Sequence, residues 1–253
     1  MNKNERLETL IKELSSAEIP YSFEDKWRLF RSLVNVRKPK PISREFLKIQ
    51  DELLQSLIKE KGVTAIDELR PIKDNIYLWQ GDITTLKIGA IVNAANSGML
   101  GCFAPCHACI DNVIHTFAGV QLRLECAEIM KKQGYSEPTG RAKITKAYNL
   151  PCDYILHTVG AIVLGELTET DCKILSSCYR SCLELAEENG VNSIAFCCIS
   201  TGEFHFPNEK AAEIAIDAVT RFIGEKQSGI KIVFNVFKDF DYEIYKRLLG
   251  KNS

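Results

Sequence analysis

The chain has 253 residues, of which 45% are hydrophobic and 26% are charged, a composition typical of globular proteins. Its formal net charge of -1 gives no overall positive field, which argues against a nucleic-acid partner. No apolar run reaches the roughly 18 residues of a transmembrane helix, and the charged N-terminus lacks the apolar core of a signal peptide, so we expect neither membrane insertion nor export.

Apolar residues recur at helical spacing in three stretches of residues 1–70, and no convincing strand occurs there. The stretches begin at Leu7, Trp27 and Phe46, and Ser22 stands where a helix N-cap is expected. Residues 1–70 are too few for a core of their own, so we expect a helical extension packed on the domain that follows. The extension could form a lid or a protein-recognition surface over a site, or it could only cover an exposed sheet edge or helix face.

From residue 71 to residue 253, short β-rich runs alternate with helical segments. This alternation predicts an α/β domain whose central sheet is covered by helices on both faces. The run at 193–198 is apolar at nearly every position, as expected of a buried central strand. The predicted strands are 76–79, 90–92, 142–145, 154–159, 193–198 and 231–236, and the predicted helices lie near 112–132, 171–189, 208–225 and 240–249.

Ten cysteines occur in the chain, and many of them fall on apolar faces of predicted helices and strands. Reduced cysteine behaves as a small buried hydrophobe, so we expect these to be core residues of a cytoplasmic protein. Only Cys102, Cys106 and Cys109, together with His107, are spaced like a site.

The loop after the second predicted strand carries this group, and Asp111 follows it at a predicted helix start. Thiolate and imidazole ligands favour zinc. Because no CxxC pair occurs elsewhere, the simplest ligand set is Cys102, His107 and Cys109 with an open fourth position, as in catalytic zinc sites, and Cys106 competes as a ligand. The alternative is that buried cysteines share a small-residue loop with an exposed histidine.

A short glycine-containing turn follows the predicted strand 193–198. Backbone N–H groups in such a turn before a helix bind phosphate, and the similar loop that ends at Gly101 makes a diphosphate cradle more plausible. The alternative is a plain turn with Asn208 as the helix N-cap. The residues of this turn are Ser200, Thr201, Gly202, Glu203 and Phe204.

Asp82 and Ile83 follow the first predicted strand. A carboxylate at this position can accept a hydrogen bond from an exocyclic amine or a hydroxyl. By itself such a residue more often only caps a turn, so it gains meaning in combination with the other two loops.

Four separated motifs resemble those of macrodomains and occur in the macrodomain order across about residues 72–248. Most macrodomains carry a run of glycines between the positions of Asn96 and Asp111, and here the loop with cysteines and histidine replaces it. This resembles the zinc-containing macrodomains of microbial ADP-ribosyl hydrolases, which also carry an N-terminal helical extension. The motifs are Gly81-Asp-Ile-Thr84, Ala90-Ile-Val-Asn-Ala-Ala-Asn-Ser97 with Asp111 and His115, Ile155-Leu-His-Thr-Val-Gly160, and Ile199-Ser-Thr-Gly202.

The resemblance implies a three-layer α/β/α macrodomain with a mixed central sheet at 71–253, preceded by the helical extension. In this family Asp82 and Ile83 would recognise adenine, and Asn96 would position the distal ribose and act with Asp111 in catalysis. The zinc ligands would be Cys102, His107 and Cys109, and the residues around the diphosphate and distal ribose would be Gly101, Ser200, Thr201, Gly202, Glu203 and Phe204.

Together these features predict a zinc-dependent hydrolase that removes mono-ADP-ribose from modified protein side chains, chiefly esters of Asp or Glu. Zinc would act as a Lewis acid, and Asp111 would orient or deprotonate the nucleophile. The alternatives are a non-catalytic ADP-ribose-binding module and an O-acetyl-ADP-ribose deacetylase. The expected partners are ADP-ribose and mono-ADP-ribosylated proteins, and the resemblance adds a lipoyl-carrier protein modified by a sirtuin-like transferase.

Overall fold

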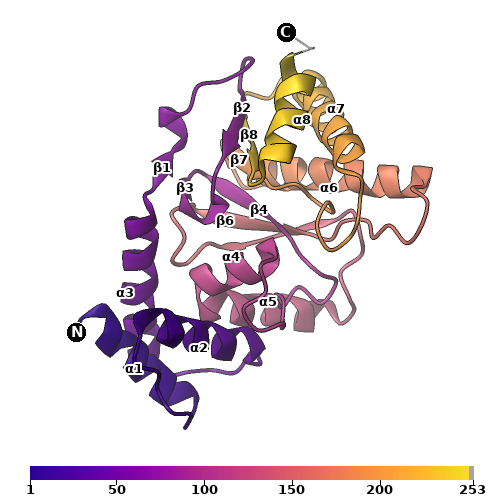
Figure 1. The fold of residues 1–253 in the computed structure, drawn as a ribbon. Helices are drawn as coiled ribbons and strands as arrows, with labels where there is room; N and C mark the ends of the chain where they lie inside the picture. The colour runs from indigo at the N-terminus through magenta and orange to yellow at the C-terminus, as the bar shows by residue number, and fades with distance from the viewer. Residues whose placement is uncertain (251–253) are drawn as a thin grey trace.

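A six-stranded sheet forms the centre of the structure, a computed structural model that describes residues 1–250 (Figure 1). The strand order is β2-β8-β7-β4-β6-β5; β5 runs antiparallel to β6 and the other neighbours are parallel, so the sheet is mixed, as predicted. Residues 251–253 of the predicted main domain lie outside the described residues. The strands are β2 (Ile76–Gln80), β4 (Ala90–Ala94), β5 (Ala142–Lys146), β6 (Tyr154–Thr158), β7 (Ser193–Phe196) and β8 (Lys231–Val236).

Helices cover both faces of this sheet, which confirms the predicted three-layer arrangement (Figure 1). Two helices lie on one face, α4 (Ile110–Ala118) and α5 (Val120–Gln133). Three lie on the other, α6 (Glu169–Glu188), α7 (Asn208–Lys226) and α8 (Asp239–Gly250). The central strands β4 and β7 are buried at nearly every position, because helices exclude water from both sides of them.

The helix predicted near 112–132 is in fact two helices, because Gly119 interrupts it. Gly119 has φ +99°, in the left-handed range that favours glycine. A Cβ atom there would lie 2.6 Å from side-chain atoms of Gln50 and Gln121. The interruption makes α4 a separate short helix whose first turn carries Asp111.

Three helices make up the N-terminal extension, as the spacing of its apolar residues predicted: α1 (Lys3–Leu14), α2 (Phe23–Val36) and α3 (Arg44–Lys61). Each begins at a capping side chain, those of Asn2, Ser22 and Ser43. The apolar faces of these helices form a small core that also includes Val120 of α5. Leu54 and Ile58 of α3 belong to the main core instead, so the two cores share elements.

The prediction that residues 1–70 contain no strand is wrong at one place. Strand β1 (Thr64–Ala65) pairs in parallel with β3 (Leu86–Lys87) in a separate two-stranded sheet. Two residues are too few to show the alternation of apolar side chains by which a strand is recognised. Two single turns of 3-10 helix, η1 (Ile66–Glu68) and η2 (Ile83–Thr85), lie next to these short strands.

The carboxyl ends of β2, β4 and β7 lie at one edge of the sheet, because these strands run parallel. The loops that leave them carry Asp82, Asn96 and Ser200. Ligand sites of α/β proteins lie at such edges. All ten cysteines of the chain are free thiols, and no helix within residues 1–250 is both long and apolar enough to span a bilayer.

Candidate active site

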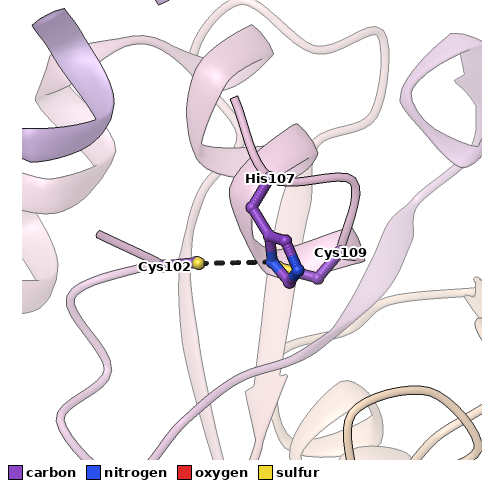
Figure 2. A group of neighbouring side chains, drawn as sticks. All are labelled: Cys102, His107 and Cys109. Atoms are coloured by element: carbon purple, nitrogen blue, oxygen red, sulfur yellow. Dashed lines mark hydrogen bonds between the residues drawn. The ribbon is translucent and has the colours of Figure 1, made fainter. Parts of the chain in front are cut away.

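Cys102, His107 and Cys109 come together in the loop between β4 and α4 (Figure 2). Cys102 Sγ lies 3.6 Å from His107 Nδ1, and the three ligand atoms all lie within 4.8 Å of one another. Cys109 is the N-cap of α4, where its Sγ accepts a hydrogen bond of 3.4 Å from a backbone N–H of the first turn. Cys106 stands apart from this group, because its Sγ donates to the carbonyl oxygen of Arg28 in α2 at 3.3 Å.

These three side chains fit a zinc ion. In tetrahedral zinc sites the Zn–S distance is about 2.3 Å and the Zn–N distance about 2.0–2.1 Å, which puts bound sulfur and nitrogen atoms about 3.6 Å apart. Cys102 Sγ and His107 Nδ1 have that separation. Among the described residues no fourth His, Cys, Asp or Glu joins the group, so water or substrate would supply a fourth ligand.

Burial disfavours the ionised form of the Cys109 thiol. Burial raises the pKa of this thiol to about 12; the hydrogen bond from the backbone of Asn112 opposes the rise, and the charge of Cys102 adds to it. A bound metal ion reverses this balance, since a coordinating thiol is deprotonated. The donor set therefore suits a cation better than it suits two free thiolates.

Asp111 is a buried carboxylate in the first turn of α4. Asn93 Nδ2 donates to its Oδ1 at 2.8 Å, and Asn96 Nδ2 donates to its Oδ2 at 3.1 Å. Burial raises the pKa of Asp111 to about 6, although the two asparagine hydrogen bonds and the charge of Arg123 lower it. The carboxylate is thus held in one orientation by two amides, an arrangement that suits a group which accepts a proton from a nucleophile.

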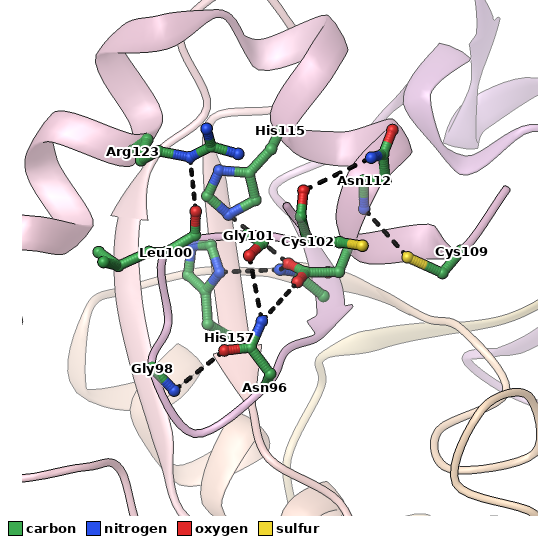
Figure 3. A network of polar contacts seen from close by, with 12 residues as sticks. Asn96, Gly98, Leu100, Gly101, Cys102, Cys109, Asn112, His115, Arg123 and His157 are labelled. Atoms are coloured by element: carbon green, nitrogen blue, oxygen red, sulfur yellow. Dashed lines mark hydrogen bonds and ion pairs between the residues drawn. The ribbon is translucent and has the colours of Figure 1, made fainter. Parts of the chain in front are cut away.

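Asn96 connects this carboxylate to the loop backbone (Figure 3). Its Nδ2 also donates to the carbonyl oxygen of Gly101 at 3.2 Å, and its Oδ1 accepts from the backbone N–H of Gly98 at 3.0 Å. The residue itself is exposed at the sheet edge. Its contact with a ribose stays a prediction, but its hold on Asp111 is a second reason to place it in the catalytic group.

Two buried histidines, His115 and His157, belong to the same polar network (Figure 3). His157 uses both ring nitrogens, Nδ1 with Asn93 Nδ2 at 3.1 Å and Nε2 with Thr145 Oγ1 at 2.9 Å. His115 Nε2 lies 3.6 Å from Asp111 Oδ1, and within the described part of the chain neither of its ring nitrogens has a hydrogen-bond partner. Burial lowers the pKa of His157 to about 3 and that of His115 well below its ordinary value, so both are neutral core residues.

Asp82 caps η2 at the end of β2, and the extension reaches it. Its Oδ1 accepts from the backbone N–H and the hydroxyl of Thr84 at 3.0 and 2.6 Å. Its Oδ2 accepts from Nζ of Lys61, the last residue of α3, at 2.8 Å. Burial alone would raise the pKa of Asp82, but the hydrogen bonds from Lys61 and Thr84 outweigh it and the pKa is lowered. Ile83, the predicted backbone partner of adenine, is buried beside it.

The loop from Ser200 to Phe206 contains the five residues that were predicted to bind phosphate, Ser200 to Phe204. Ser200 and His205 both have left-handed φ angles, +67° and +56°. Ser200 Oγ is buried without a hydrogen-bond partner among the described residues, and a Cβ on Gly160 would lie 2.0 Å from it. Strain and an unpaired polar atom of this kind cluster at functional sites. Within the alternative of a plain turn, the assignment of Asn208 as N-cap is wrong, because Pro207 is the cap and Asn208 is the first residue of α7.

This loop and the metal-ligand loop lie next to each other. Glu203 Oε1 is 3.6 Å from His107 Nε2, the ring nitrogen that faces away from Cys102. Thr201 and Phe204 are half-buried, whereas Gly202 and Glu203 are exposed. The structure therefore brings the predicted metal and diphosphate residues together at one edge of the sheet.

Local patterns missed four residues of the site. Asn93 is a polar residue within an apolar strand, and that signal could have identified it, because a buried amide needs partners. Asn112, Arg31 and Lys61 gave no comparable signal. Arg31 donates to the backbone carbonyl oxygen of His107, 76 positions later in the chain, and Lys61 donates to Asp82, 21 positions later. Local spacing does not reveal such contacts.

Comparison with known proteins identifies the family of this chain. Residues 92–215 match the Macro domain family. A protein-ADP-ribose hydrolase of Treponema medium is 57% identical over 92% of this chain and 91% of its own length. One of Staphylococcus aureus (strain MRSA252) is 51% identical over 98% of this chain and 96% of its own. The structure of the Trypanosoma brucei macrodomain in complex with ADP-ribose superimposes with a TM-score of 0.66, at 32% identity over 87% of this chain and 95% of that one. The chain belongs to the macrodomain family, in the branch of the protein-ADP-ribose hydrolases.

Proposed function

We propose that this protein is a zinc-dependent hydrolase that removes single ADP-ribose units from modified protein side chains, chiefly from Asp or Glu esters. One observation carries the proposal: the ligand atoms of Cys102, His107 and Cys109 lie within 4.8 Å of one another, and buried Asp111 follows two residues later. The names of the full-length relatives support the hydrolytic activity. The metal and the ester linkage rest on the donor set and on the resemblance to zinc-containing macrodomains.

In this proposal the three ligands hold zinc, which supplies Lewis-acid chemistry when bound. Asp111, held by Asn93 and Asn96, orients the nucleophile and accepts its proton. The oxygen of the nucleophile then bonds to C1″ of the distal ribose as the bond from C1″ to the side-chain carboxylate breaks, and the Asp or Glu side chain leaves as a carboxylate. Ionisation of a nucleophile close to the sheet edge is favoured because the accepting carboxylate needs no reorientation.

Recognition of ADP-ribose follows the same edge of the sheet. Asp82 and the backbone of Ile83 would bind adenine, and Lys61 would keep the Asp82 carboxylate ionised and oriented. Backbone N–H groups would bind the diphosphate. Two loops would supply these N–H groups: the loop that ends at Gly101 and the loop formed by Ser200, Thr201, Gly202 and Glu203. Phe204 would lie beside the distal ribose.

The proposed partners are mono-ADP-ribosylated proteins. A lipoyl-carrier protein modified by a sirtuin-like transferase is the partner that the resemblance suggests. The ten free thiols support a reducing compartment, the cytoplasm, as the place of action.

Release of ADP-ribose from an automodified protein, measured with and without a zinc chelator, tests this function. We expect release by the zinc-loaded protein, loss of release with chelator, and recovery on addition of zinc. Unchanged release with chelator would remove zinc from the proposal. Binding of ADP-ribose without release would favour the non-catalytic binding module, and turnover of O-acetyl-ADP-ribose alone would favour the deacetylase.

A further inference from the structure

Helix α2 of the extension is bonded directly to the loop that carries the metal ligands. Arg31 Nη2 donates to the backbone carbonyl oxygen of His107 at 2.6 Å. One turn further along α2, Asn35 Oδ1 accepts from the backbone N–H of Cys106 at 2.9 Å. Because both contacts are to backbone atoms, α2 constrains the path of the loop and not only one side chain.

Asn112 extends this contact from α2 to the ligands themselves. Arg31 Nη2 donates to Asn112 Oδ1 at 2.8 Å. Asn112 Nδ2 donates to the carbonyl oxygen of Ala104 at 2.9 Å. It also donates to that of Cys102 at 3.5 Å, and the backbone N–H of Asn112 donates to Cys109 Sγ at 3.4 Å (Figure 3). Asn112 is completely buried, so each of these groups would be costly to leave unpaired.

Outside α2 and Asn112, the loop has further contacts. The His107 N–H donates to the Ala104 carbonyl at 3.3 Å, and Asn96 Nδ2 donates to the Gly101 carbonyl at 3.2 Å. The Arg123 guanidinium lies 4.3 Å from the centroid of the Phe103 ring.

Residues 101–109 contain no helix or strand, and Phe103, Ala104 and Pro105 are exposed. Cys106 has a left-handed φ of +54°, a conformation that a residue with a Cβ rarely keeps unless its surroundings impose it. Asn35, which holds the N–H of Cys106, is itself buried and fixed by its own hydrogen bond to Thr116 Oγ1 at 3.0 Å.

We propose that α2 is a structural part of the metal site, with Arg31 and Asn35 as positioning residues that hold the ligand loop in its metal-binding shape and so set the zinc affinity. This inference rests on the metal site of the proposed function. It gives residues 1–70 a role other than a lid: the extension supports the ligands from behind. Residues that orient metal ligands from outside the coordination sphere typically change metal affinity about 10- to 100-fold when they are removed.

Zinc dissociation constants of full-length variants, measured by competition with a chromophoric chelator, test the proposal. We expect Arg31→Met and Asn35→Ala to bind zinc about 10- to 100-fold more weakly than wild type, and Arg31→Lys to lie between. The matched control is Arg6→Met. Arg6 Nη2 binds Glu52 at 2.9 Å within the extension and does not touch the loop, so zinc affinity should stay within about twofold.

Two further measurements separate positioning from general damage. The zinc-free melting temperature and the ADP-ribose dissociation constant should change no more in Arg31→Met than in Arg6→Met. Equal zinc affinities in these two variants would overturn the inference. If Arg31→Met fails to fold, Asn35→Ala alone decides, because it removes only the bonds to Cys106 and Thr116. If the wild-type chain binds no zinc, the metal site of the proposed function fails, and that result is distinct from unchanged affinity in the variants.

Discussion

The two loops that meet at the sheet edge keep their shapes in different ways. The metal-ligand loop, residues 101–109, is bonded to Arg31 and Asn35 of a helix about 70 positions earlier in the chain. The loop 200–206 is closed mainly by its own backbone: His205 N–H donates to the Gly202 carbonyl and Phe206 N–H to the Ser200 carbonyl, each at 3.0 Å. One loop is therefore held mainly by a distant helix. The other is closed mainly by its own backbone, with one hydrogen bond from outside, from the Val163 N–H to the Phe204 carbonyl at 2.9 Å.

The glycines of the two loops show the same difference. Gly101 has φ +79°, and a Cβ there would lie 2.7 Å from the ring of His115, so the fold itself requires glycine. Gly202 has no such φ, and a Cβ there would meet nothing within 4 Å. If Gly202 has a function, that function is to leave room for a ligand.

Loss of a metal ligand should have the largest effect on the metal-ligand loop. Cys102→Ala should abolish stoichiometric zinc binding and lower the rate of ADP-ribose release by about a thousandfold, because the metal contributes several kcal/mol to the transition state. Metal analysis after dialysis and a single-turnover assay measure the two effects. Cys106→Ala is the control, since Cys106 Sγ faces the carbonyl oxygen of Arg28 and not the ligand group. Full turnover in Cys102→Ala would remove the metal from the reaction.

Asp111→Asn tests the proposed proton acceptor, Asp111, which follows the metal-ligand loop in the chain. The substitution keeps the shape but removes the proton acceptor, so we expect turnover to fall about a hundredfold. The dissociation constant of ADP-ribose, measured by calorimetry, should change by less than about fivefold, because Asp111 is buried behind Asn93 and Asn96. A variant that binds weakly but turns over normally would contradict this assignment.

Paired alanine substitutions of the two glycines test the comparison directly. Gly101→Ala should destabilise the protein by about 1–3 kcal/mol in urea unfolding, because its Cβ clashes with the buried ring of His115. Gly202→Ala should leave stability unchanged within about 0.5 kcal/mol. It should nevertheless weaken ADP-ribose binding about tenfold, because the added methyl group separates the diphosphate from the backbone N–H groups. Wild-type affinity in Gly202→Ala would place the diphosphate elsewhere.

The buried histidine His157 should make stability depend on pH. Its pKa is about 3 in the folded protein and about 6.5 when unfolded, so the unfolded chain takes up the proton first. The contribution of His157 is fully present above about pH 6.5 and is lost as the pH falls towards 3. When the pH is lowered from 7 to 5.5, protonation of His157 in the unfolded chain should reduce the free energy of unfolding by about 1 kcal/mol.

Urea unfolding at the two pH values should show this loss in the wild type. A His157→Gln variant should show a pH dependence that is smaller by the same amount, since glutamine does not titrate. Equal pH dependence in the two proteins would mean that His157 is not buried in its neutral form.

The second contact of the extension, from Lys61 to Asp82, should have the smallest effect. Lys61→Met keeps an unbranched apolar side chain but loses Nζ, which makes the 2.8 Å bond to Asp82 and lies 3.7 Å from the centroid of the Phe117 ring. We expect ADP-ribose binding to weaken about threefold, because an exposed ion pair contributes at most about 1 kcal/mol. Lys59→Met, on the same last turn of α3, is the control and should bind as the wild type does. Equal affinities in the two variants would separate Lys61 from adenine recognition.

Patterns that extend over several residues predicted the main helices and strands. Features that depend on contacts between distant segments could not be predicted from the sequence. The strand 231–236 was predicted with its observed bounds, since six consecutive residues show the pattern of a buried strand. The two-residue strands were missed because two residues show no alternation of apolar side chains. The break at Gly119 was missed because it involves the side chain of Gln50 in a distant helix. The metal-ligand group was predicted because ligand chemistry and spacing are local properties. Arg31 and Lys61 could not be predicted, because their partners are chosen by the packing of the extension.

The sharing of core residues between the extension and the sheet domain limits how this protein can evolve. Val120 completes the small core of the extension, and Leu54 and Ile58 complete the main core. Exchange of the first 70 residues with those of an unrelated protein would therefore open both interiors at once. A change of volume in α2 or α3 at these contacts would need a matched change on the other side of the contact.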